Sequence, residues 1–127
     1  MDDLPTPTTR ELEILKVLWE HGAKSVSDVH KLLKPTDGKQ QAVNTVQTLI
    51  RIMEGKGLVT HETMGRTFIY RPMFSRDESA VRFLDRVFDG AASQLMLSLL
   101  NSEKISPAEL AELQTMIASA RHTEAVR

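Results

Sequence analysis

One stretch of the chain carries polar groups suited to binding nucleic acid. On a helix of about 100° per residue, Asn44, Gln47, Thr48 and Arg51 fall on one side, and no acidic residue precedes Glu54 there. A solvated helix face usually mixes Glu with Lys, because such pairs stabilise it. Amide, hydroxyl and guanidinium groups bond base edges and phosphate oxygens without repelling a polyanion. The pattern suits a helix in a DNA groove, and taken alone it fits a merely neutral polar face equally well.

The opposite side of this helix is apolar, which predicts packing on a core. Its members are Ala42, Val43, Val46, Leu49, Ile50 and Met53. Two helices precede it. The first, over residues 8–22, starts with a capping box of Thr8 and Glu11, and the second, over residues 25–35, has Ser25 as its cap. Their predicted buried residues are Leu12, Leu15, Leu18 and Trp19 in the first and Val26, Val29, Leu32 and Leu33 in the second.

The third helix is followed by the pattern of a β hairpin. Glycines at residues 55 and 57 end the helix, and the stretches 58–63 and 67–72 are typical of two short strands around a glycine turn. Three helices followed by a hairpin predict a winged helix-turn-helix domain over residues 1–74. In that architecture the third helix enters the major groove and the hairpin, or wing, lies against the flanking backbone.

Basic residues add to the predicted DNA contacts. Between residues 40 and 72 the basic residues outnumber the acidic ones. Arg51, Lys56 and Arg66 are the cations that we assign to DNA binding. Arg66 lies at the predicted wing turn, where it would reach a phosphate or the minor groove, although a solvated turn residue would look the same. Ser25 lies at a helix N-terminus, where free amides hold phosphates, but plain capping also explains it.

The second half of the chain, residues 75–127, predicts three more helices with apolar stripes. The first has a capping box of Ser75 and Glu78, and the third has Ser106 as its cap, Glu109 closing the box and an end near residue 121. Three short helices make a thin core, so we expect a second copy of the chain to complete it. The expected dimer contacts are Phe83, Leu84, Val87, Phe88, Leu95, Leu99, Leu113 and Ile117. The alternative is a monomer in which these helices fold back onto the winged helix.

Composition narrows the class of protein. Sixteen basic and 17 acidic residues give a net charge of −1, which argues against indiscriminate coating of nucleic acid, so any DNA binding must be local. The absence of cysteine excludes disulfides and thiolate metal sites. The acidic start and the lack of a long apolar run predict a cytoplasmic protein without direct membrane binding.

Signatures of catalysis are missing. The four histidines, at positions 21, 30, 61 and 122, show no zinc-site spacing, and the chain has no nucleophile elbow, P-loop or dinucleotide fingerprint. We therefore expect neither an enzyme nor a bound cofactor or metal.

Taken together, these segments resemble the penicillinase-repressor family, which includes the BlaI, MecI and CopY transcriptional repressors. The pieces that carry the resemblance are TRELEILKVLWEHGAKSVSDVH, NTVQTLIRIMEGKGLV, GRTFIYRP and VRFLDRVFDGAASQLMLSLL. The resemblance implies a homodimeric repressor that occupies a palindromic operator. It also implies that Asn44, Thr45, Gln47 and Thr48 face the bases, whereas Ile52 stands where the family commonly has Arg.

The same resemblance suggests how repression ends. In the penicillinase branch, a membrane-bound receptor with a metalloprotease domain leads to cleavage of the repressor at an Asn-Phe bond, and Ser98 and Leu99 occupy those positions here. The copper-responsive branch uses cysteine ligands, which this chain lacks. A different class of function, a winged helix that binds a protein partner, remains the alternative because fold alone does not decide function.

Overall fold

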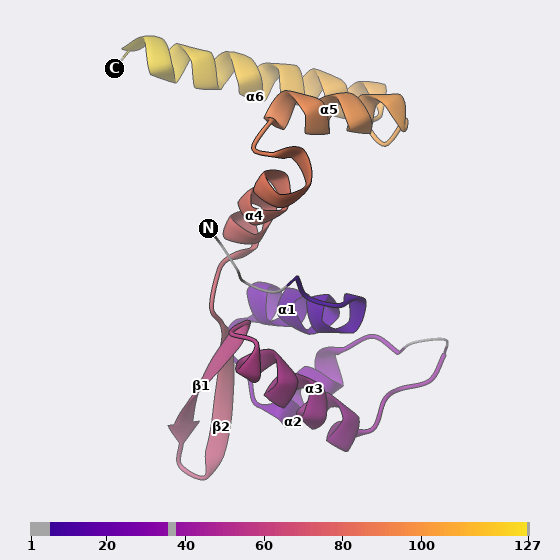
Figure 1. The fold of residues 1–127 in the computed structure, drawn as a ribbon, viewed down its shortest axis with the longest axis vertical. Helices are drawn as coiled ribbons and strands as arrows, with labels where there is room; N and C mark the ends of the chain where they lie inside the picture. Colours follow the sequence, from indigo (N-terminus) through magenta and orange to yellow (C-terminus); the bar gives the residue numbers. More distant parts are fainter. Residues whose placement is uncertain (1–5, 36–37, 127) are drawn as a thin grey trace. The chain divides into compact units, whose positions relative to one another are not determined.

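The structure is a computed structural model, and it describes residues 6–35 and 38–126. In this part of the chain six helices and one two-stranded antiparallel sheet follow one another (Figure 1). They are α1 (Thr9–His21), α2 (Val26–Leu32), α3 (Val43–Gly55), β1 (Val59–Met64), β2 (Thr67–Pro72), α4 (Arg76–Phe88), α5 (Ala92–Asn101) and α6 (Pro107–Val126). The chain divides into two compact units, Met1–Ala80 and Val81–Arg127, and α4 crosses that boundary. The expected order of helices and hairpin is confirmed.

The core of the first unit joins α1, α2, α3 and the hairpin. Its buried apolar side chains include Ile14, Leu15, Leu18, Val29, Val46, Ile50, Met53, Leu58, Val59 and Tyr70. Two hydrophobic positions predicted for α3 are instead at the surface: Val43 is 43% exposed, and Ala42 is the exposed N-cap residue. Leu32, predicted as buried, is 38% exposed. These residues lie at helix ends, beyond the turns that face the core, so helical periodicity alone misplaced them.

The wing is a regular hairpin held against the helices. Val59 pairs with Pro72 and Met64 with Thr67, and Gly65 takes the positive φ of 64° that the tight turn requires. Backbone hydrogen bonds in both directions join Lys24 to Tyr70, with N···O distances of 3.0 and 2.8 Å. This bridge attaches β2 to the α1–α2 connection, so the wing is fixed beside the start of α2.

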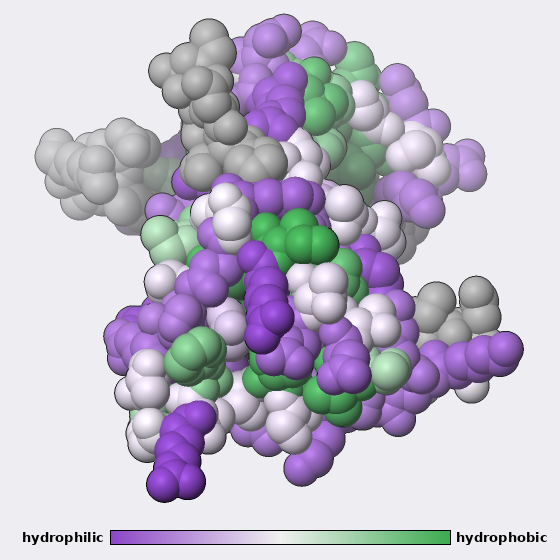
Figure 2. Space-filling model, turned by 60° about the horizontal axis from the view of Figure 1, so that its bottom comes forward, coloured by the Kyte–Doolittle hydropathy of each residue, from purple (hydrophilic) through white to green (hydrophobic). Residues whose placement is uncertain are grey.

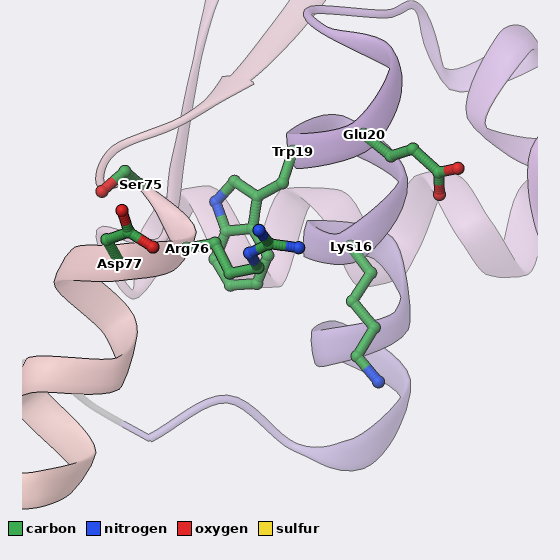
Figure 3. Close-up of a pocket in the computed structure, with 6 residues that line it drawn as sticks. All are labelled: Lys16, Trp19, Glu20, Ser75, Arg76 and Asp77. Carbon is green, nitrogen blue, oxygen red and sulfur yellow. The ribbon is translucent and has the colours of Figure 1, made fainter. Parts of the chain in front are cut away.

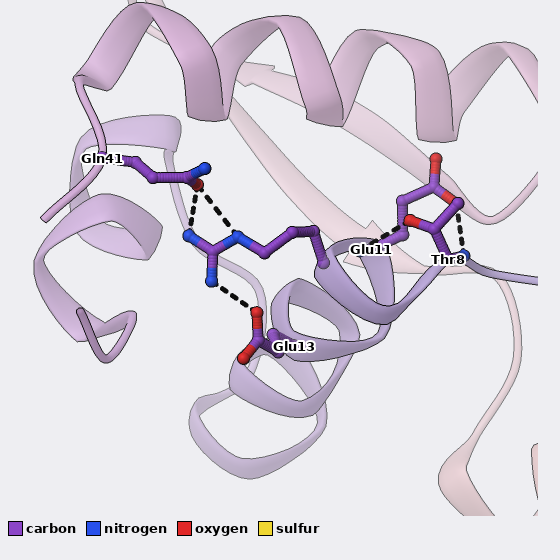
Figure 4. A network of polar contacts seen from close by, with 5 residues as sticks. Thr8, Glu11, Glu13 and Gln41 are labelled. Atoms are coloured by element: carbon purple, nitrogen blue, oxygen red, sulfur yellow. Dashed lines mark hydrogen bonds and ion pairs between the residues drawn. The ribbon is translucent and has the colours of Figure 1, made fainter. Parts of the chain in front are cut away.

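Glu11 joins the first helix to the end of the third. The capping box of Glu11 with Thr8 is present as predicted (Figure 4). The Glu11 side chain is also buried and accepts hydrogen bonds from Lys56 Nζ at 3.0 and 2.9 Å. Burial alone would raise the pKa of the Glu11 carboxyl. The hydrogen bonds from the Thr8 backbone and Lys56, together with the Lys56 charge, outweigh it and hold the pKa below its usual value of 4.5.

The segment that follows β2 is held against α1. The indole N–H of Trp19 donates to the carbonyl oxygen of Phe74 at 2.9 Å, and the two rings lie 6.4 Å apart. Because this bond spans 55 positions of the chain, it ties the segment after β2 directly to α1.

The helices that follow the hairpin, α4 to α6, are mostly open to solvent. Ser75 and Glu78 form the predicted capping box of α4, and Ser106 Oγ accepts from the Glu109 amide at the start of α6. The last helix runs to Val126 and so exceeds its predicted end near residue 121, because no glycine or proline follows to stop it. None of the side chains described from residue 81 to residue 122 is buried. Within the described residues, no helix is both long and apolar enough to cross a bilayer.

Candidate nucleic-acid interface

Helix α3 has one buried side and one open side. Val46, Ile50 and Met53 are 0% exposed, and they hold the helix on the core. The predicted DNA contacts Asn44, Thr45, Thr48 and Arg51 are exposed. The first turn contains no acidic residue, so its amides and macrodipole present a positive end to an approaching anion.

A hollow of about 500 Å³ lies between the start of α2, α3 and the wing. Three residues predicted separately from the sequence meet there: Ser25 at the N-cap of α2, Gln47 on α3 and Arg66 in the wing turn. The structure thus brings together groups that are 22 and 19 positions apart in the sequence. Figure 2 turns the wing and α3 toward the viewer and shows a mainly hydrophilic surface with small, separate apolar groups.

Two predicted contacts already have partners inside the protein. Ser25 Oγ accepts a hydrogen bond from the Asp28 amide at 3.2 Å, so it caps α2. Lys56 Nζ is held by both carboxylate oxygens of Glu11. The contacts observed for these two side chains are structural, and DNA binding by either stays a prediction.

The segment before α3 is anchored by long-range polar contacts. Arg10 donates to the Gln41 side-chain oxygen through Nε, at 3.1 Å, and through a terminal nitrogen, and it also pairs with Glu13 (Figure 4). His30 Nε2 donates to the Gln41 backbone oxygen at 2.7 Å, and Gln40 Nε2 donates to the His30 carbonyl at 3.2 Å. These contacts fix the N-terminal end of α3. Sequence reasoning missed them because no local motif marks a pair 31 positions apart.

A second set of contacts joins the other end of α3 to the wing. His61 Nδ1 on β1 lies 2.6 Å from Glu54 Oε2 in the last turn of α3. His61 also stacks on Phe68 of β2, with ring centroids 4.2 Å apart and planes inclined by 21°. The only acid on α3 is therefore paired rather than free.

Another hollow of the first unit, of about 730 Å³, contains none of the predicted site residues. It is lined by Lys16, Trp19 and Glu20 from α1 and by Ser75, Arg76 and Asp77 around the start of α4 (Figure 3). Two cations and two carboxylates balance one another there. No group of three or more His, Asp or Glu side chains placed to hold a metal ion occurs among the residues that the structure describes.

Comparison with known protein families decides the family of this chain. The family model described as Penicillinase repressor matches residues 7–119. The chain belongs to the penicillinase repressor family. This confirms the resemblance drawn from the sequence segments. Members of the penicillinase repressor family are transcriptional repressors rather than enzymes.

Individual relatives of the family match over most of their length. The penicillinase repressor of Bacillus licheniformis is 28% identical over 121 residues, which cover 92% of this chain and 93% of the relative. The methicillin resistance regulatory protein MecI of Staphylococcus aureus (strain N315) is 20% identical over 114 residues, which cover 87% of this chain and 91% of MecI.

Solved structures confirm the winged helix. The solution structure of Bacillus licheniformis BlaI, in its monomeric form in complex with the blaP half-operator, is 29% identical with a TM-score of 0.50. It covers 61% of this chain and 93% of that one. The transcriptional regulator Tm0710 of Thermotoga maritima, 16% identical with a TM-score of 0.51 over 94% of this chain and 80% of that one, shares the fold.

Proposed function

We propose that this protein is a sequence-specific repressor that binds a palindromic operator as a homodimer in the cytoplasm. The observation that carries the proposal is the exposed, acid-free side of α3 beside the hollow that also contains Arg66. The BlaI relative whose solved structure contains the blaP half-operator supports DNA as the partner. In this arrangement α3 lies in the major groove and the wing meets the flanking backbone.

The contacts divide by chemistry. Asn44, Thr45, Gln47 and Thr48 present amides and hydroxyls for base edges, whereas Arg51 and Arg66 present charge for phosphates. Ile52, which is 47% exposed on α3, stands where the family commonly has Arg, so we expect an operator unlike those of the antibiotic-resistance members.

Dimerisation would supply the affinity that a chain of net charge −1 lacks. Phe83, Val87 and Ile117 are 53%, 53% and 55% exposed in the single chain. The other expected dimer contacts, which are half-buried, are Leu84, Phe88, Leu95, Leu99 and Leu113. Because α4 and α5 bury no side chain of their own, a second copy of the chain is the natural cover for these helices. We accordingly propose residues 1–74 as the DNA-binding domain and residues 75–127 as the dimerisation domain.

Release from DNA by a membrane-bound metalloprotease sensor is the regulatory step that the family implies. Ser98 and Leu99 lie inside α5, with Ser98 exposed and Leu99 half-buried. A protease needs an extended substrate, so cleavage at this bond would require local unfolding of α5. Loss of that helix would remove dimer contacts and lower operator affinity.

The test is selection of bound fragments from a random DNA library by the purified full chain at near-physiological salt. Recovery of an inverted repeat with half-site centres roughly 34 Å apart, or a multiple of that, is the expected result. A folded, dimeric sample that enriches no sequence would contradict the proposal and would favour a protein partner at the same face of α3.

A further inference from the structure

Phe68 places a large apolar ring at a mainly polar surface. It lies on β2, two positions after Arg66, and it is 48% exposed. Its side chain borders the hollow shared by Gln47 and Arg66. A single exposed apolar residue is ordinary on a protein surface, so exposure alone carries no functional meaning.

The ring is held in place by contacts that begin on α3. His61 Nδ1 donates to Glu54 Oε2 at 2.6 Å, and the His61 ring stacks on Phe68 with ring centroids 4.2 Å apart. Tyr70 approaches the same pair, with ring centroids 5.3 Å from His61 and 6.5 Å from Phe68. Because these rings support one another, little side-chain freedom remains to be lost when something packs on the open part of Phe68.

The surroundings of the ring define what would pack on it. The hollow combines the apolar ring with hydrogen-bonding groups from Ser25 and Gln47 and with the cation of Arg66. The carboxylate of Asp28, near the start of α2, also lines it. A nucleic-acid strand alternates charged phosphates with sugars that have apolar edges. Arg66 offers a cation for a phosphate and Phe68 an apolar surface for a sugar, so a DNA backbone that passes the wing matches these two groups.

We propose that Phe68 packs against a deoxyribose of the strand that passes between α3 and the wing, and that His61 and Glu54 are positioning residues that hold its ring there. This inference rests on the proposed operator binding and adds a contact that is neither a base reading nor a charge contact. Its contribution is expected to be independent of sequence, because every nucleotide carries the same sugar.

Salt dependence separates this contact from an ionic one. Replacing Phe68 by Ala should weaken binding to the selected operator and to random DNA by a similar factor, roughly tenfold, with the slope of log affinity against log salt unchanged. Replacing Arg66 by Ala should also weaken both, but should flatten that slope by about one unit, because one phosphate contact is lost.

Hydroxyl-radical cleavage of the DNA gives the direct readout, because this reagent attacks accessible sugars. With wild-type protein the sugars beside the wing should be protected, and Phe68→Ala should expose them while protection along α3 stays. His61→Ala should expose the same sugars, because the ring loses the side chain behind it. Met73→Ala is the matched control, since Met73 is an apolar residue that is 55% exposed after β2 and does not border the hollow.

The outcomes are separable. Unchanged affinity and protection in Phe68→Ala, with wild-type operator binding intact, would overturn the inference and leave the proposed function standing. Wild-type protein that enriches no operator would overturn both. Continued protection in His61→Ala would remove the positioning role alone. If Phe68→Ala does not fold, Phe68→Leu decides: it keeps an apolar side chain without the flat ring, and partial loss of the same protections is expected.

Discussion

At the residue scale, Gln47 and Thr48 differ in the hydrogen-bonding groups that they can offer to DNA. The Thr48 hydroxyl donates to the Asn44 backbone oxygen at 3.0 Å, so in this position it has acceptor capacity and a methyl group left for a base. Gln47 lies half-buried at the edge of the hollow, where its amide offers both donors and an acceptor. Gln47 is therefore the better candidate for a paired contact with one base.

We expect Gln47→Ala to lower affinity for the selected operator by about 1–3 kcal/mol and to change binding to random DNA little, because it removes a base contact and no charge. Fluorescence anisotropy titrations with both DNAs measure the difference. Equal loss on operator and random DNA would contradict base reading by this side chain.

Glu11 makes a second prediction at this scale, about stability. Its folded pKa lies below the usual value of 4.5, so the ionised carboxylate stabilises the fold above that pH, and the contribution is lost as the pH falls below 4.5 through the folded pKa. Glu11→Gln preserves the capping box but not the charge opposite Lys56, and it should destabilise the protein by about 2 kcal/mol at neutral pH.

The measurement is denaturant unfolding of wild type and Glu11→Gln from neutral to acid pH. The stability difference should narrow as the pH falls below 4.5, because the wild-type carboxylate is then protonated. Glu20→Gln removes a charge from an exposed position of α1 and serves as control. A constant difference across the pH range would show that the Glu11 charge is not the cause.

At the scale of elements, α6 tests the dimer proposal. Ile117 is 55% exposed, and a charge placed there would have to be buried in the expected interface. Ile117→Glu should therefore raise the dimer dissociation constant by about a hundredfold, equivalent to about 3 kcal/mol. Sedimentation over a range of protein concentrations measures this shift.

Thr115→Glu is the matched control, because Thr115 is an exposed polar residue two positions away on the other side of the same helix. It should remain dimeric. Dimerisation that survives in Ile117→Glu, or fails equally in both variants, would count against the assigned face of α6.

A structural feature could be predicted from the sequence when the residues that produce it are close together in the chain. The capping boxes at Thr8 and Ser75 were predicted correctly, because each depends on residues three positions apart. The anchoring of Gln41 by Arg10 and His30 was not predicted, since it depends on where the tertiary fold brings distant segments. Lys56 shows the same limit: its charge was visible in the sequence, and its partner Glu11 was not.

At the scale of the whole molecule, operator geometry reports on assembly. If two copies bind as a rigid dimer, an insertion of about five base pairs between the half-sites turns one half-site to the opposite side of the DNA. Affinity should then fall toward that of a single half-site. The same insertion outside the palindrome should have no effect. Unchanged affinity with the internal insertion would mean that the two half-sites are bound independently.

Fold class and family followed from the sequence, because several locally marked elements in one order suffice to specify them. The partner that covers residues 75–127 could not be predicted from the sequence in the same way. The apolar stripes of residues 75–127 were visible in the sequence, but a stripe does not say what covers it, and the single chain leaves those side chains exposed or half-buried. The candidate site was predicted in part. Its residues were identified one by one from the sequence, but only the folded structure shows that several of them line one hollow.

The hydrogen bond between Trp19 and Phe74 has a practical consequence. Trp19 is the only tryptophan in the sequence, and its indole N–H is bonded to the backbone where the chain passes from β2 toward α4. Indole emission shifts to longer wavelength when the ring becomes wetter. The protein therefore carries an intrinsic optical probe at this junction, and its emission spectrum can follow loosening of the junction during DNA binding or proteolysis without an added label.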